Sequence, residues 1–291
     1  MRSQSVLGLS DAQLQYFQNT FHLSYHLNYL HVCLQSFPLS GMNILEVGGA
    51  LPASLVIDHL GCNSWTTIEA PSYDRELGEA NQFHNNSQDQ QSQKHHQDKY
   101  KRLYLDIEAI TKDHYQQYDL VFSIACFEHI NRLPQALRVM HECLKPGGHL
   151  FTMHSPIWSA FDGHHFPKSI PERFGKDLDP SGVIGPWEHL LFDRSQLYQR
   201  LKEQYDQSFA EEAIYWIYNS DHINRYFSED YFQVFSDSMF NILSFEKTFS
   251  INVPQPIKSA LSVKYRAYND FENNGIYAIL QNKSQPASLI F

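Results

Sequence analysis

The chain has 291 residues, of which 42% are hydrophobic and 14% aromatic, enough for one large packed domain. A formal charge of −10 argues against a protein that tracks nucleic-acid phosphates, and no apolar run approaches the roughly 20 residues that span a bilayer. Four cysteines without Cys-x-x-Cys spacing and a start without a secretory signal predict a soluble, cytoplasmic protein, with neither nucleic acid nor membrane as partner.

Residues 10–40 predict a helical cap. Ser10 and Gln13 have the spacing of a capping box, and apolar residues then recur every three or four positions as far as residue 32, as on one face of a long helix. His22 and His26 lie beside that face. The helix is either a plain cover with exposed histidines or a lid over a substrate pocket.

Residues 43–60 predict a strand, a glycine turn and a helix, the opening unit of a nucleotide-binding α/β fold. An apolar run at 44–47 carries the acid Glu46 and ends at Gly48 and Gly49. Glycines allow a sharp turn and a close approach of backbone to a ligand. Pro52 is well placed as the first residue of the helix.

Two further strands are predicted to end on acids. Residues 65–69 end at Glu69, about 20 residues beyond the turn, where nucleotide-binding folds place an acid on the ribose hydroxyls. Residues 102–107 form the next predicted strand, with Asp106 and Ile107 at its end. The polar segment 81–99 between them reads as a surface loop, and its pair His95-His96 lacks the neighbours that would fix a metal site.

Residues 118–153 predict a buried strand, a loop, a helix over 131–144 and another strand. The order Asp119-Leu120-Val121, Glu128-His129, then Lys145-Pro146-Gly147-Gly148 before the strand at 149–153, resembles that of class I S-adenosylmethionine (SAM) dependent methyltransferases of the small-molecule, type 11-like kind. The resemblance covers residues 40–155. The family's acid-x-Gly-x-Gly-x-Gly pattern falls on Glu46, Gly48, Ala50 and Pro52, so two of its three glycines are replaced.

The resemblance implies an α/β fold with a doubly wound, mostly parallel Rossmann-like sheet, an antiparallel last strand, and SAM as cofactor. It implies that Asp106 hydrogen-bonds the adenine amino group and that Ile107 packs on the ring. The residues we assign to cofactor binding are Glu46, Gly48, Gly49, Glu69, Asp106, Ile107, Ser123 and Ala125.

The segment after the fifth strand is the expected place for substrate chemistry, because ligands bind beyond the carboxyl ends of parallel strands. It carries several histidines, of which His165, His189 and His164 are the catalytic candidates. They are structural, or one is a general base, or two or three of them hold a divalent metal with nearby carboxylates. No helical His-x-x-x-His spacing supports the metal, which stays open.

The whole chain, 1–291, reads as one domain: a cap at 1–40, a SAM-binding core at 41–155, a helical substrate-binding insertion at 156–239 and final strands in 240–291. Within the last part, 240–251 and 276–281 are predicted as an antiparallel hairpin.

We therefore expect SAM-dependent methyl transfer to a small molecule, with oxygen, nitrogen or carbon as acceptor undecided. The alternative is a regulatory or scaffolding module that binds SAM or S-adenosylhomocysteine without catalysis, which the two missing glycines favour. A nicotinamide dehydrogenase is disfavoured, since the Gly-x-Gly-x-x-Gly fingerprint is absent. The oligomeric state stays open.

Overall fold

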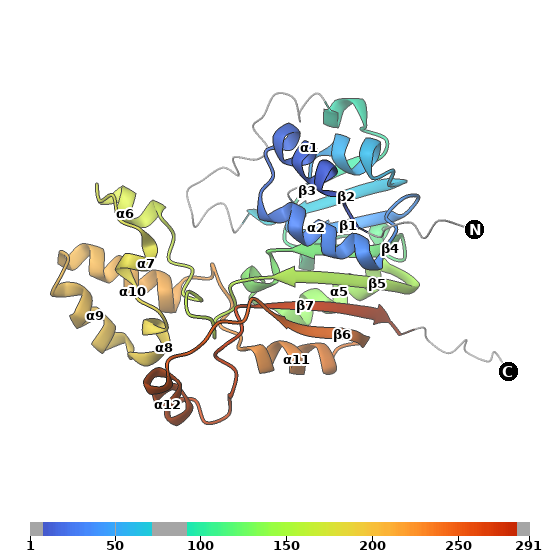
Figure 1. Ribbon diagram of the computed structural model, residues 1–291. Helices are drawn as coiled ribbons and strands as arrows, with labels where there is room; N and C mark the ends of the chain where they lie inside the picture. Colours follow the sequence, from blue (N-terminus) through green and yellow to red (C-terminus); the bar gives the residue numbers. More distant parts are fainter. Residues whose placement is uncertain (1–7, 50, 72–91, 284–291) are drawn as a thin grey trace.

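The computed structural model describes residues 8–49, 51–71 and 92–283, which form a seven-stranded sheet covered by helices (Figure 1). The strand order is β3-β2-β1-β4-β5-β7-β6, and β7 runs antiparallel to both of its neighbours, β5 and β6. The doubly wound, mostly parallel sheet predicted from the sequence is therefore confirmed. The strands are β1 (Asn43–Val47), β2 (Ser64–Glu69), β3 (Tyr100–Tyr104), β4 (Tyr118–Ile124), β5 (Leu144–His154), β6 (Phe240–Thr248) and β7 (Gly275–Asn282).

The central strands are apolar on both faces because helices cover both. Leu45 of β1 pairs with Thr66 of β2 and Val121 of β4, and both Leu45 and Val121 are fully buried. The strand order reverses between β1 and β4, so the chain leaves these two strands in opposite directions and opens a crevice at their carboxyl ends. This end of the sheet is where a ligand site is expected.

One face of the sheet is covered by α1 (Asp11–Phe21) and α2 (Tyr25–Ser36). The expected single long helix is wrong: the chain adopts a left-handed conformation at His22 (φ 54°), which ends α1. The capping box of Ser10 and Gln13 is present as predicted. His26 was expected at the surface but is only 4% exposed, because the break turns α2 toward the sheet.

The other face is covered by α5 (Leu133–Cys143) and α11 (Ser228–Ser236), which share one apolar cluster with β5, β6 and β7. α5 follows its predicted range closely. The strand expected at 149 begins earlier, at Leu144, and includes the Lys145-Pro146-Gly147-Gly148 stretch. Gly147 there has a φ of +76°.

A separate group of helices lies to one side of the sheet (Figure 1) and has its own apolar cluster. It includes α12, which lies between β6 and β7 in the chain and packs on α8, so two chain segments build the group. α11 contacts β6 instead, although it falls within 156–239. The group consists of α6 (Ser169–Arg173), α7 (Pro180–Val183), α8 (Glu188–Leu191), α9 (Arg194–Lys202), α10 (Gln207–Asn219) and α12 (Gln255–Lys264).

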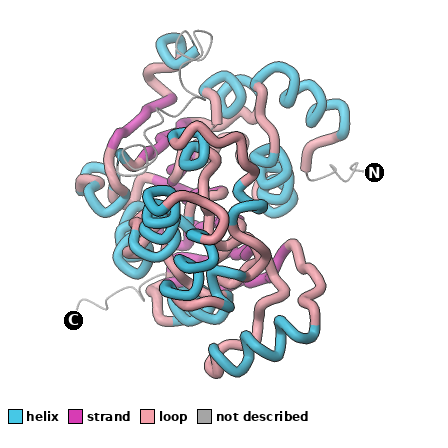
Figure 2. Tube along the Cα trace, turned by 90° about the vertical axis from the view of Figure 1, so that its left-hand side faces the viewer, coloured by secondary structure: helices cyan, strands magenta, loops and turns pink. Residues whose placement is uncertain are grey.

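Short helical turns follow several strands. In Figure 2, helices and loops surround the strands. The third strand was expected at 102–107, but β3 ends at Tyr104 and Ile107 begins a 3-10 turn. Residues 92–95 are helical where a loop was expected, while 81–91 lie outside the described residues. The turns are η1 (Leu55–His59, a π-helix), η3 (Ile107–Ala109), η4 (Lys112–His114) and η5 (Phe127–His129).

None of the helices in the described part of the chain combines the length and apolar character needed to cross a bilayer.

Candidate functional site

The glycine turn after β1 brings three strand ends together. Gly48 has a φ of +108°, and a Cβ there would lie 2.6 Å from the Cβ of Cys126, which follows β4. Gly49 has a φ of +38°, and its Cβ would lie 2.7 Å from the Cγ of Glu69, at the end of β2. Both positions therefore require glycine for conformation and for space.

Glu46 stabilises this turn through buried hydrogen bonds. It is 1% exposed, accepts a hydrogen bond from the Trp65 indole at 2.8 Å, and accepts another from the Leu51 amide at 3.3 Å. The carboxylate thus ties the start of the helix after the turn to β1 and β2. Its assignment to the cofactor stays a prediction.

Glu69 lies at the carboxyl end of β2 and forms a bidentate pair with Arg102 of β3. Nη2 of Arg102 donates to Oε2 at 2.6 Å and Nε donates to Oε1. The acid is 4% exposed, so little water reaches the pair. A ribose that hydrogen-bonds Glu69 would therefore compete with Arg102 for the same oxygens.

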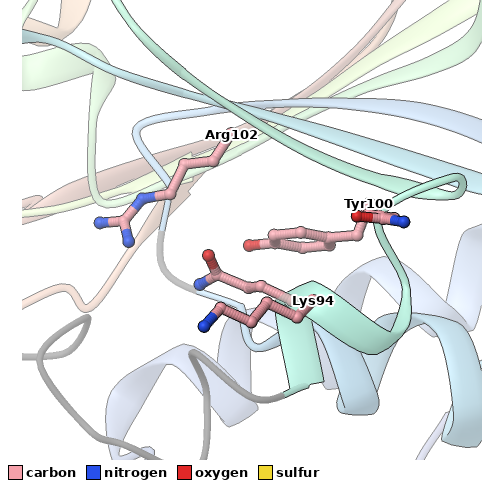
Figure 3. A pocket seen from close by; sticks show the side chains of 5 residues that line it. Lys94, Tyr100 and Arg102 are labelled. Carbon is pink, nitrogen blue, oxygen red and sulfur yellow. The ribbon is translucent and has the colours of Figure 1, made fainter.

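Arg102 also borders a pocket of about 360 Å³ (Figure 3). Lys94 and Tyr100 line the same pocket as Arg102. The Tyr100 hydroxyl donates to the carbonyl of Leu51 at 3.1 Å. The pocket thus lies between β3 and the segment that begins with the helical residues 92–95. Gln93 and Gln97 complete its lining.

The other predicted cofactor residues lie at the end of β4 or just after β3 and β4. Asp106 precedes η3, where its carbonyl accepts from the Ala109 amide at 2.8 Å, and Ile107 is buried in the apolar cluster beneath. Ser123 is buried and donates to the carbonyl of Val47 at 2.8 Å, which joins β4 to β1 just before the glycine turn. Ala125 has a φ of +46°. All four lie at the carboxyl end of the sheet, and their contacts with SAM stay predictions.

Glu128, in η5 two residues beyond Cys126, is a further functional candidate. In the sequence it stands only as part of the Glu128-His129 motif and is not among the predicted site residues. It is 1% exposed, and its Oε2 has no hydrogen-bond partner among the described residues. Burial raises its pKa from 4.5 to about 8, against hydrogen bonds from its own amide and that of Ser155. A buried carboxylate with an unused oxygen is costly and needs an explanation. The Glu-His pair before the helix was the available signal.

Tyrosines face this carboxylate from two helices. Tyr29 of α2 shares a 2.9 Å hydrogen bond with the Ser155 hydroxyl. Burial raises the pKa of Tyr29, the bond to Ser155 opposes the rise, and the carboxylate of Glu128 adds to it. From α11, Tyr231 is also buried, and its pKa is raised by burial and by Glu128. Helix α2 therefore closes over the carboxyl end of β4.

The three histidines proposed as catalytic do not share one environment. His189 is 1% exposed, and its Nε2 donates to the carbonyl of Trp158 at 2.9 Å. His164 accepts from the Phe166 amide at 3.0 Å, 5.5 Å from the His189 ring between centroids. Burial lowers the pKa of His189 to about 4 and that of His164 well below its usual value. Both rings pack in the helical group beside the sheet.

His165 lies instead with His129 and His222. One ring nitrogen from each of the three lies within 4.8 Å of the others. His165 was a candidate from the sequence, whereas His129 was noted only as part of a motif. His222 follows α10, where no local pattern identified it. His95-His96 forms no such group in the described chain, and His96 pairs with Asp58 at 3.0 Å.

Comparison with known families matches residues 29–236 to the methyltransferase domain family. Among solved structures, an S-adenosylmethionine-dependent methyltransferase from Mesorhizobium loti is 12% identical, with a TM-score of 0.46 and coverage of 90% of this chain and 99% of that chain. Geranyl diphosphate C-methyltransferase from Streptomyces coelicolor is 12% identical, with a TM-score of 0.42 and coverage of 94% of this chain and 76% of that chain. Comparison with curated proteins gives no match.

Proposed function

Because the chain belongs to the methyltransferase domain family and is a SAM-dependent methyltransferase, we propose that it methylates a small molecule and that Glu128 is the general base. The acceptor carries a proton, as a hydroxyl or amine does, which a base removes during transfer. The observation that carries the proposal is the buried, unpartnered Oε2 of Glu128 among the described residues, two positions from the residue that packs on the glycine turn.

The residues at the end of the sheet fit the cofactor that the family implies. Gly48 and Gly49 form a turn with no side chain above the ends of β1 and β2, and Glu69 lies directly against Gly49. The Thr67 hydroxyl, which also lies against Gly49, is buried and has no hydrogen-bond partner among the described residues. When bound, SAM supplies a methyl group on a sulfonium, open to in-line attack. The turn and Glu69 would hold and orient it.

Glu128 is favoured over His165, His189 and His164 as the base because of its place in the fold. It follows β4, on the same short segment as Cys126, and that residue touches the glycine turn. His164 and His189 instead pack within the helical group, where Trp158 and Phe166 engage one nitrogen of each ring.

The enclosure of Glu128 supports a small acceptor. The Ser155 amide donates to the carboxylate, and the charge of Glu128 acts on the nearby Tyr29 and Tyr231, which are both at most 5% exposed. An acceptor reaches the acid when α2 lifts from the sheet, the lid function considered from the sequence. Such a closed site excludes water from the transfer. A cytoplasmic location agrees with the four free cysteines.

The test replaces Glu128 with glutamine, which keeps the shape and removes the base. Release of S-adenosylhomocysteine with a small-molecule extract as acceptor source should slow by about 10²–10⁴-fold. SAM affinity by calorimetry should stay unchanged, since Glu128 does not hold the cofactor. Glu142→Gln, on the nearby helix α5, is the matched control and should keep full turnover. Full turnover by Glu128→Gln would exclude this residue as the base.

A further inference from the structure

We propose that His129, His165 and His222 bind one divalent transition-metal ion, such as Zn²⁺, through three imidazoles. The three come from the turn after β4, the loop after β5 and the loop after α10. One ring nitrogen from each lies within 4.8 Å of the others. Around zinc at 2.0–2.1 Å, such nitrogens lie about 3.3 Å apart, so a pair at the 4.8 Å limit needs to close by about 1.5 Å.

Hydrogen bonds to backbone carbonyls fix which nitrogen two of the rings can offer. Nδ1 of His129 lies 2.6 Å from the carbonyl oxygen of His222, and Nε2 of His165 lies 2.6 Å from that of Pro156. A carbonyl oxygen only accepts, so each of these nitrogens carries the proton. Neutral rings then have lone pairs at Nε2 of His129 and Nδ1 of His165. Ligand histidines typically donate their second nitrogen in this way.

The loop that carries His222 is docked rigidly on the turn that carries His129. The Asn224 side chain donates to the carbonyl of Phe127 at 2.6 Å, and its amide donates to the carbonyl of Glu128 at 2.7 Å. The Tyr231 hydroxyl donates to the side-chain oxygen Oδ1 of Asn224 at 2.9 Å. The two histidines are thus positioned by bonds that do not involve their own rings.

A third contact positions His165. The Trp216 indole of α10 donates to the His165 carbonyl at 3.0 Å, and His165 itself has a left-handed φ of +46°. α10 therefore fixes both the loop of His165 and, through its end, the loop of His222. The site joins the helical group to the carboxyl end of the sheet.

The donor set selects the class of ion. Three imidazoles suit zinc, copper, nickel or iron, whereas magnesium and calcium prefer oxygen ligands. A ligand imidazole must be neutral, and the carbonyl contacts of His129 and His165 each need only one ring proton. Three protein ligands leave a fourth position for water or another small ligand.

The site is independent of the proposed methyl transfer, because its evidence lies in the histidines and their carbonyls alone. The full chain, stripped with a chelator and dialysed, is titrated with Zn²⁺ by calorimetry. We expect one saturable site, with affinity reduced at least about a hundredfold in His165→Gln and in His222→Gln. His149→Gln is the control: its half-buried ring packs on Phe37 of the cap and should not alter binding. Absence of a saturable site in the folded wild type, or equal affinity in all variants, would overturn the proposal.

A second measurement needs no variant. X-ray absorption at the zinc edge of the loaded wild-type protein should show an imidazole shell near 2.0 Å. A sulfur shell, or oxygen ligands alone, would place the ion elsewhere and refute the assignment.

Discussion

Arg102 and Glu69 face each other across neighbouring strands, with the guanidinium on both carboxylate oxygens, while Gly49 packs on the same acid from the glycine turn. The acid that the sequence assigned to ribose recognition therefore has a charged partner on β3. The same geometry links the glycine turn to the pocket beside β3, which Arg102 lines.

Glu69→Gln should weaken SAM binding because it removes a charged acceptor from the ribose hydroxyls. The expected loss is about 1.5–3 kcal/mol, or about 10- to 150-fold in affinity by calorimetry. The control is Glu188→Gln, which removes another carboxylate paired with an arginine, Arg200, but on α8 in the helical group. Unchanged SAM affinity in a folded Glu69→Gln protein would remove Glu69 from the cofactor site.

Arg102→Gln should lower the free energy of unfolding by about 3–5 kcal/mol, because it removes the charge that faces the buried carboxylate of Glu69. The matched control is Lys145→Gln. Lys145 pairs with Asp119, but those side chains are 38% and 33% exposed, so a loss below about 1 kcal/mol is expected. Urea denaturation measures both. Equal losses in the two variants would mean that the Arg102 pair is effectively solvated.

Gly48→Ala should abolish SAM binding and destabilise the fold. Alanine at this position would have an unfavourable positive φ, and its Cβ would lie 2.6 Å from the Cβ of Cys126. Gly147→Ala separates the two effects: it has a φ of +76° but no atom within 4 Å of the Cβ, so it should cost only about 1–2 kcal/mol. Melting temperatures and SAM titrations compare them. Normal SAM binding by Gly48→Ala would show that the turn is not the cofactor site.

The buried His26 should make the fold sensitive to acid. Burial lowers its pKa from 6.5 to about 4, so the unfolded chain binds more protons between these values. The stability gained by burying the neutral His26 ring is present above pH 6.5 and is lost as the pH falls toward 4. Between pH 7 and 5 the wild type should lose about 2 kcal/mol more than His26→Gln, measured by urea denaturation. Parallel pH profiles for the two proteins would contradict this, and above pH 7 the profiles should run parallel.

The sheet and its glycine turn could be predicted because their signals are local. Apolar runs, the glycine pair and the acid at each strand end lie in short stretches of sequence, and β1, β2 and β4 formed where expected. The sequence did not predict the break between α1 and α2, because the break depends on a positive φ at His22. A histidine side chain gives no sign of that backbone conformation.

The histidine cluster could not be predicted because it depends on tertiary contacts. His129, His165 and His222 lie up to 93 residues apart and meet only through loops docked by Asn224 and Trp216. Likewise, the unused oxygen of Glu128 follows from its burial in the folded chain, which the motif alone does not reveal.

Catalysis of methyl transfer distinguishes an enzyme from a protein that only binds SAM. The most direct measurement incubates the protein with SAM bearing a deuterated methyl group and a fraction of small metabolites, then searches by mass spectrometry for products. We expect a small molecule that gains one labelled methyl in place of hydrogen, formed by the wild type and far more slowly by Glu128→Gln. If the wild type binds SAM by calorimetry yet labels no small molecule from any fraction, the chain is a binding module and the account is wrong.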